Sequence, residues 1–442
     1  MISFRAAAIA AATVLGATSA VAQVSTPATP RVGSVTAGPE YGPPAPTTTL
    51  PAPVLVPRDG PLPANLTLSQ ALEEAEARAP ALLAARARVE AAQARIRQAG
   101  FRANPELAVE IDNLLGTGAL SGLQQTEATV SLNQRLDVSG RRRTRVAAAQ
   151  ALLLADQIRF AIARADLALS VRQQFARAIT ARDRLRIAEE NEFNARELAR
   201  VAGILVQEGR EPPLRGIRAR SAAAQAAAEL EAARADELAA RATLTSLFGV
   251  ATPPEQVSGS LIDLQATQVD PEQSLDVRLA DAERVAAEAE VGSQVAQGRL
   301  DPAVGVGVRY VRETGDFGLI GGLTMPLQIF DRNQGNVSAA QSNVRAAEAN
   351  LASATATARV RTQNAIIAVE AAEARVQALE GSAVPEAGEA LRLAQLSYGE
   401  GRATLLELLD AQNAYRTAQL ALIEARLALA NATAELGRVA AQ

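Results

Sequence analysis

Two carboxylates stand three residues apart in the segment YGEGRATLLELLDAQ, which covers residues 398–412. Residues three apart lie on the same face of a helix, so Glu407 and Asp410 would present their charges side by side. In a symmetric oligomer they would stack as two acidic rings, and like charges that close repel unless cations or arginines neutralise them. The spacing therefore indicates either a charged constriction or a plain solvated face beside a turn.

A second segment, VQEGREPPLRGIRAR at 206–220, aligns with the first but carries cations where the first carries acids. When the glycines are aligned, Arg215 falls opposite Glu407 and Arg218 falls opposite Asp410. If the two segments alternate around a ring, the arginines would pair with the acids and hold an entrance shut. The alternative is that the arginines face outward and bind a partner.

The chain contains no histidine and no cysteine. This excludes disulfides, thiolate nucleophiles, Cys/His zinc sites and histidine-based catalysis. Acid pairs such as Glu73/Glu74 and Glu189/Glu190 stand on predicted helices without a converging nucleophile or base. We therefore expect no enzyme, no catalytic residue, no metal site and no cofactor. The net charge of −4 gives no reason to expect a nucleic acid partner.

The composition points to long helices and the N-terminus points to export. The 442 residues are 48% apolar but only 3% aromatic, which is typical of closely packed helices. Residues 1–22 combine Arg5, an Ala-rich run and a small-x-small cleavage pattern, and so predict a secretory signal peptide, with an uncleaved anchor as the alternative. The Pro-rich residues 23–64 predict an extended, disordered leader. Beyond the signal no apolar run reaches 18 residues, so we expect β-strands rather than helices to cross a membrane.

From residue 65 the chain repeats itself with a period of about 190 residues. The repetition predicts two units, 65–255 and 256–442, each built as helix, β-hairpin, long helix and helix. The matching stretches are 104–113 with 301–310, 131–150 with 324–341, and 206–220 with 398–412.

Alternating apolar residues predict four strands of about ten residues, the length that crosses a bilayer when tilted. The predicted strands are 105–113, 127–136, 302–312 and 317–329. Long helices are predicted at 143–208 and 336–400, each about 100 Å long, the second bent near Pro385. Shorter helices are predicted to stack end to end beside them, at 69–101 (capped by Ser69), 217–248, 271–300 and 411–440.

Two hairpins supply four strands, whereas the smallest membrane barrels have about eight. Copies must therefore share a barrel, and three copies would give twelve strands and a pseudo-sixfold wall of helices. Four arginines follow the first hairpin, and either contact lipid phosphates or are solvated: Arg141, Arg142, Arg143 and Arg145. Four aromatic residues near strand ends fit either a membrane girdle or ordinary packing: Phe101, Tyr310, Phe317 and Phe330.

Together these features resemble the TolC-type outer-membrane efflux proteins, from about residue 65 to the end. The duplication, the hairpins begun by Asn-Pro or Asp-Pro, the long helix and the segment YGEGRATLLELLDAQ carry the resemblance. The stretch MPLQIFDRNQGNV is similar to the branch serving cobalt-zinc-cadmium type cation efflux. The resemblance implies a mainly α homotrimer of a Gram-negative bacterium, with a twelve-stranded β-barrel in outer membrane lipid and an α-helical barrel in the periplasm.

The resemblance also implies a passive export duct, fed by an inner-membrane resistance-nodulation-division type pump through a periplasmic adaptor (membrane fusion) protein. The family motif maps a periplasmic gate onto Tyr398, Glu407 and Asp410, while Arg215 stands where better-known members have an acid. The cargo is expected to be divalent heavy-metal cations. Drugs or a secreted polypeptide as cargo, and a periplasmic coiled-coil spacer, are the alternatives. The adaptor is expected to dock on the two turns, at Gly209, Pro212, Pro213, Gly399, Gly401 and Leu405.

Overall fold

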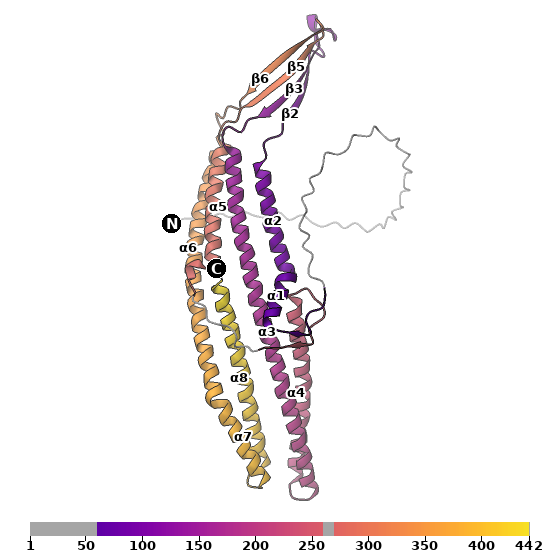
Figure 1. Cartoon of the computed structure of the whole chain (residues 1–442), viewed down its shortest axis with the longest axis vertical. Coiled ribbons are helices and arrows are strands. Elements are labelled where there is room, and N and C mark those ends of the chain that lie inside the picture. The colour runs from indigo at the N-terminus through magenta and orange to yellow at the C-terminus, as the bar shows by residue number, and fades with distance from the viewer. Residues whose placement is uncertain (1–59, 260–268, 442) are drawn as a thin grey trace, which may run out of the picture. The chain divides into compact units, whose positions relative to one another are not determined.

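The computed structural model describes residues 60–259 and 269–441, which belong to one unit formed by Leu55–Gln442. The predicted signal peptide at 1–22 and all but the last five residues of the predicted leader at 23–64 lie outside the described residues. In the described part, long helices run from a small sheet at one end to two tight turns at the other (Figure 1).

Both halves of the chain follow one order of elements. The first half has β1 (Asn65–Leu66), α1 (Leu68–Arg78), α2 (Pro80–Gly100), β2 (Glu106–Asp112), η1 (Gly118–Leu120), β3 (Glu127–Arg135), α3 (Arg141–Gln207), α4 (Pro213–Ser246) and β4 (Gln256–Val257). The second has η2 (Pro271–Gln273), α5 (Leu275–Gln297), β5 (Ala303–Val311), β6 (Asp316–Thr324), α6 (Gln334–Ala378), the π-helical turn η3 (Leu379–Ala383), α7 (Val384–Gly399) and α8 (Leu405–Val439).

The first helical segment differs from the prediction at its start and in its middle. Thr67, not Ser69, caps α1: its hydroxyl accepts from the Gln70 N–H at 3.4 Å, and the Gln70 side chain accepts from the Thr67 N–H at 3.1 Å. This reciprocal pair satisfies two otherwise unbonded donors. The single helix predicted at 69–101 is two helices, because Pro80 lacks an N–H and holds Ala79 in an extended conformation (ψ 121°).

The four predicted strands form one antiparallel sheet in the order β2-β3-β5-β6. Three strands end within two residues of their predicted bounds, but β6 stops at Thr324 rather than at 329. Thr324 pairs with Ala303, the first residue of β5, so no partner strand continues beyond it. Pro326 follows closely and has no N–H for a ladder bond.

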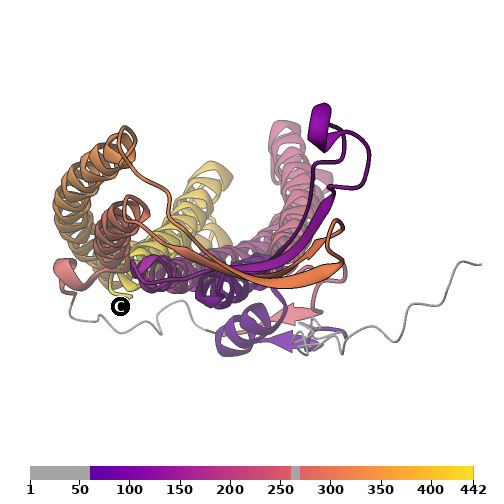
Figure 2. The same ribbon diagram turned by 90° about the horizontal axis from the view of Figure 1, so that it is seen from above.

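The register gives this sheet one apolar and one polar face. Val109, Val130, Val308 and Leu319 pair in one row across all four strands, and all four side chains are exposed. On the opposite face, Arg309 forms an ion pair with Glu127 at 3.0 Å. The sheet is curved and open at both edges, with the helices spread below it along an arc (Figure 2).

Short helices pack along long ones as predicted (Figure 1). Helix α3 has 67 residues, with α2 against the part nearer the sheet and α4 against the part nearer the turns. In the second half α5 and α8 take the same places beside α6 and α7. Where a bend near Pro385 was predicted, a π-turn at 379–383 interrupts the helix, because proline cannot donate to the carbonyl four residues earlier.

The largest hydrophobic cluster lies around the middle of α3, where α1, the end of α4 and the parallel β1–β4 pair cover it. Elsewhere the helices form a thin wall whose contacts are mostly alanines. One described helix, α3, contains an 18-residue stretch that is long and apolar enough to cross a membrane, by length and composition alone. The expectation that no helix could do so was too strict, although α3 packs against five other helices, α1, α2, α4, α5 and α8.

Candidate functional site

The two turns farthest from the sheet share one backbone design. Gly209 ends α3 with φ 72°, and Gly401 follows α7 with φ 73°, both in the left-handed region that favours glycine. The Arg210 N–H donates to the Leu205 carbonyl and the Arg402 N–H to the Ser397 carbonyl, each at 2.8 Å. Together with the 3.0–3.1 Å bonds of the two glycine N–H groups, this is the Schellman motif at both sites.

The turns differ in how the next helix begins. Helix α4 starts with Pro213, which needs no partner for an N–H at the first position. Helix α8 starts with a capping box instead: the Glu407 carboxylate accepts from the Thr404 N–H at 2.6 Å, and the Glu407 N–H donates to the Thr404 hydroxyl at 3.3 Å. Both helices begin several residues earlier than predicted at 217 and 411, so Glu407 and Asp410 lie inside the first turns of α8.

This capping box sets the electrostatics of Glu407. The hydrogen bond from the Thr404 backbone, followed by the one from its hydroxyl, holds the pKa of Glu407 below its usual value. The Glu407 side chain is exposed, as are those of Asp410 and Arg218. Glu407 therefore stays ionised at neutral pH, and within one chain its bonds go to its own helix start.

The two turns are packed against each other through a small core. It contains Leu198, Ala202, Ala219, Leu405 and Leu408, with Tyr398 half-buried at its edge. Leu405, predicted as an adaptor-docking residue, is only 2% exposed in one chain and packs toward the other hairpin. The neighbouring Leu406 is 62% exposed instead.

Tyr398 connects the turns electrostatically as well. Burial raises the pKa of the Tyr398 phenol, the Glu211 carboxylate adds to the rise, and Arg215 opposes it. Glu211 and Arg215 form an ion pair one helical turn apart. The Tyr398 hydroxyl is buried and has no hydrogen-bond partner among the described residues. The structure thus brings Tyr398, Arg215 and Glu211 together.

The sequence analysis did not predict a role for Glu211. The spacing of four residues between Glu211 and Arg215 at a helix start nevertheless indicates an ion pair. The predicted pairing of Arg215 with Glu407 does not occur inside one chain, because Arg215 binds Glu211 and Glu407 binds Thr404. Pairing between copies stays a prediction. Gly209, Pro212, Pro213, Gly399 and Gly401 all lie exposed at the two turns. Their role in docking stays a prediction.

The described residues include no group of three or more potential metal ligands. Exposed apolar side chains surround both reversals, at Leu214, Ile217, Leu396 and Leu406.

The model of the outer membrane efflux protein family matches residues 71–250 and 271–442. The chain belongs to this family. The two matched segments each carry one hairpin, one long helical stretch and one turn. The predicted resemblance to outer-membrane efflux proteins is confirmed.

The relatives include metal-resistance proteins. The chain is 33% identical over 275 residues to the nickel-cobalt-cadmium resistance protein NccC of Alcaligenes xylosoxydans xylosoxydans, a match covering 61% of this chain and 62% of NccC. It is 29% identical over 354 residues to the cobalt-zinc-cadmium resistance protein CzcC of Cupriavidus metallidurans, covering 78% and 83%. The first match spans less than two thirds of that relative's length.

The fold is that of a solved outer membrane protein, VceC of Vibrio cholerae. The two structures superpose with a TM-score of 0.69 at 22% identity, over 85% of this chain and 96% of VceC. At this identity the likeness establishes the architecture of strands and helices.

Proposed function

We propose that this chain is the outer membrane channel of a tripartite efflux system and that three copies share one channel. The four-stranded sheet carries the proposal, because one face exposes Val, Leu, Ile and aromatic side chains while β2 and β6 each keep an unpaired edge. Unpaired backbone groups in lipid cost several kcal/mol each. Pairing β2 of one copy with β6 of the next removes both edges and makes a twelve-stranded barrel with the polar face inward.

Aromatic side chains at both ends of the apolar face support a membrane position for the sheet. Tyr310 and Phe317 are cross-strand neighbours beside the β5–β6 turn, with ring centroids 5.0 Å apart. Phe101 and Phe330, 62% and 90% exposed, lie toward the helices. Aromatic residues gather at the two interfaces of a bilayer, so these side chains mark its two borders.

The channel itself performs no catalytic step in this proposal, and the energy comes from an inner-membrane pump of the resistance-nodulation-division type. The periplasmic adaptor docks on the α3–α4 and α7–α8 turns, where exposed glycines and prolines are flanked by Leu214 and Leu406. Apolar side chains at sharp reversals fit the insertion of a partner helical hairpin.

Reconstitution tests the channel. The purified protein is expected to run as a heat-modifiable trimer and to give single-channel currents in planar bilayers. A stable, water-soluble monomer without currents would exclude the channel and favour the periplasmic coiled-coil spacer.

The same turns would form the periplasmic gate. In a ring of alternating turns, Arg215 and Arg218 of one copy face Glu407 and Asp410 of the next and pair with them, while Tyr398 packs beside Arg215. Conductance of the Arg215→Ala/Arg218→Ala double variant should rise relative to the wild type. Unchanged opening would show that the arginines face outward, toward a partner.

The proposed cargo is divalent heavy-metal cations, on the strength of the similarity to NccC and CzcC. The lack of histidine and cysteine suits ions that pass without tight capture. A deletion strain should accumulate zinc, cobalt, nickel or cadmium, measured as intracellular metal. Normal metal levels with accumulation of drugs, or with loss of a secreted polypeptide, would assign one of those cargoes instead.

A further inference from the structure

A cavity of about 450 Å³ lies where the first hairpin joins α3. Its lining comes from the segment before β2, the end of β3 and the first turn of α3, and five of its side chains are arginines. Two aspartates, Asp137 and Asp301, are its only acids.

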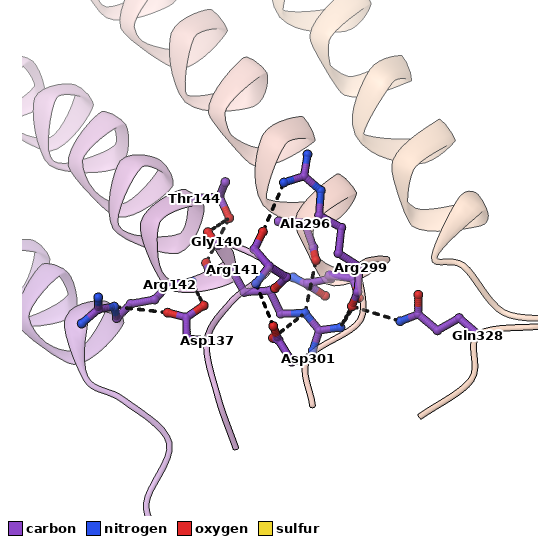
Figure 3. A network of polar contacts seen from close by, with 11 residues as sticks. Asp137, Gly140, Arg141, Arg142, Thr144, Ala296, Arg299, Asp301 and Gln328 are labelled. Carbon is purple, nitrogen blue, oxygen red and sulfur yellow. Dashed lines mark hydrogen bonds and ion pairs between the residues drawn. The ribbon is translucent and has the colours of Figure 1, made fainter. Parts of the chain in front are cut away.

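Arg141 has a structural role, because it binds Asp301 and the end of helix α5 (Figure 3). Its guanidinium contacts the Asp301 carboxylate at 3.3 Å and donates to the carbonyls of Ala296 at 3.2 Å and Gln297 at 2.7 Å. These carbonyls end helix α5, so Arg141 caps a helix of the other half of the chain. Asp301 also accepts from the Ser139 N–H at 3.0 Å, which uses its second oxygen.

Arg142 is neutralised in the same way. Its guanidinium pairs with Asp137 at 3.2 Å, and its backbone N–H donates to the same carboxylate at 3.3 Å (Figure 3). Both acids of the cavity are thus used by Arg141 and Arg142.

Among the residues that the structure describes, three arginines of the cavity have no acidic partner. Within the described residues, Arg102 and Arg135 form no ion pair, and Arg145 contacts only the carbonyls of Ala99 at 3.4 Å and Phe101 at 3.3 Å. Like charges gathered in one cavity repel unless an anion joins them. The first turn of α3 also has no acidic residue, although a helix start favours negative charge.

The cavity adjoins apolar surface on the side of the sheet. Phe101 and Val138, 62% and 66% exposed, belong to its lining. Gln134, also in the lining, pairs with Val304, which pairs with Leu323 in the apolar row nearest the helices. A ligand that fills this place therefore meets arginines at one end and an apolar face at the other.

We propose that this cavity binds the phosphate of an anionic phospholipid, held by Arg102, Arg135 and Arg145, with the acyl chains along the apolar face of the sheet. The assignment rests on the proposed function, since that function places the sheet in a bilayer. Arginine forks bind phosphate oxygens bidentately, and a free phosphate ion would leave Phe101 and Val138 uncovered. Of the four arginines predicted at this junction, only Arg145 serves the lipid.

The test measures lipid retention on the full-length detergent-purified protein by native mass spectrometry. The matched pair is Arg145→Gln against Arg143→Gln: both residues are exposed near the start of α3, but only Arg145 lines the cavity. Retention of phosphatidylglycerol should fall about fivefold for Arg145→Gln and stay within about twofold of the wild type for Arg143→Gln. The triple variant that adds Arg102→Gln and Arg135→Gln should lose at least about tenfold.

Three outcomes would overturn the proposal: equal losses for Arg143→Gln and Arg145→Gln, equal retention of phosphatidylcholine, or displacement of the lipid by millimolar inorganic phosphate, which would make the cavity a phosphate-ion site. Single-channel currents recorded on the same samples separate this proposal from the proposed function. If the wild type conducts but the lipid measurements fail, only the lipid site falls. If the wild type does not insert and conduct, the channel itself falls.

Discussion

At the α3–α4 turn the chain leaves its long helix through Gly209 and restarts on Pro213, with an internal Glu211–Arg215 ion pair. At the α7–α8 turn it leaves through Gly401 and restarts on Thr404, with Glu407 folded back as a cap. The reversals have the same backbone hydrogen bonds, but the helix after the first carries Arg215 and Arg218 where the helix after the second carries Glu407 and Asp410. The duplication has therefore kept the geometry of the reversal, which sets the length of the wall, while the chemistry of the two helix starts has diverged.

The core between the turns should give the largest effect. Leu405→Ala is expected to lower the free energy of local opening at both turns by about 2–4 kcal/mol, because it removes a buried side chain that both hairpins contact. Leu406→Ala, its exposed neighbour, should change the same quantity by less than about 0.5 kcal/mol. Hydrogen exchange of the two turns measures both. If only the α7–α8 turn loosens, the turns are not coupled.

The shared backbone can be tested at three glycines where an added methyl group would meet open space, so only backbone conformation matters. Gly209→Ala and Gly401→Ala should each destabilise their turn by about 1–2 kcal/mol, because φ is positive at both sites. Gly399→Ala, in the helical last turn of α7, should stabilise by about 0.5–1 kcal/mol. Hydrogen exchange measures the free energy of local opening at each turn in these variants. Effects of different size at Gly209 and Gly401 would show that the two turns do not share one backbone design.

Lowering the pH should destabilise the α7–α8 turn before the α3–α4 turn. The pKa of Glu407 is lower in the folded chain than in the unfolded one, so its contribution is present above the unfolded pKa and is lost as the pH falls through the folded pKa. Hydrogen exchange, corrected for its intrinsic pH dependence, should show the α7–α8 turn loosening below about pH 4 before the α3–α4 turn. Glu407→Gln should remove this difference; a turn that still loosens in that variant owes its acid sensitivity to another group.

Tyr398→Phe should give the smallest effect. The hydroxyl is buried without a hydrogen-bond partner in the described residues, so its removal is expected to leave local stability unchanged or to raise it by up to about 1 kcal/mol. Conductance should remain within about twofold of the wild type. A markedly more open channel would instead reveal a partner for this hydroxyl on a neighbouring copy.

The strands and long helices were predictable because each depends on a local pattern: alternation for β2, β3 and β5, and uninterrupted helical periodicity for α3. Two predicted elements were too long because something outside the pattern ends them. Pro80 divides the first predicted helix, and β6 stops where its partner strand β5 begins. At the candidate site the sequence named Tyr398, Arg215 and Glu407, but within one chain the two charged residues take other partners. Arg215 pairs with Glu211 and Glu407 pairs with Thr404 because these partners are close in the chain. Bringing them together therefore costs little additional conformational entropy.

The sequence by itself determined the duplication, the absence of histidine and cysteine chemistry, the two glycine reversals and the amphipathic strands, because all of these are properties of residue type and spacing. Only the tertiary structure decided that Leu405 is buried between the turns and that Tyr398 lies beside Glu211 and Arg215. It also decided that Arg141 caps a helix of the opposite half, while Arg145 contacts only backbone carbonyls among the described residues. These contacts join residues that are far apart in the chain. Several arginines and acids could pair by charge alone, and the alignment of the packed helices determines which of them come into contact.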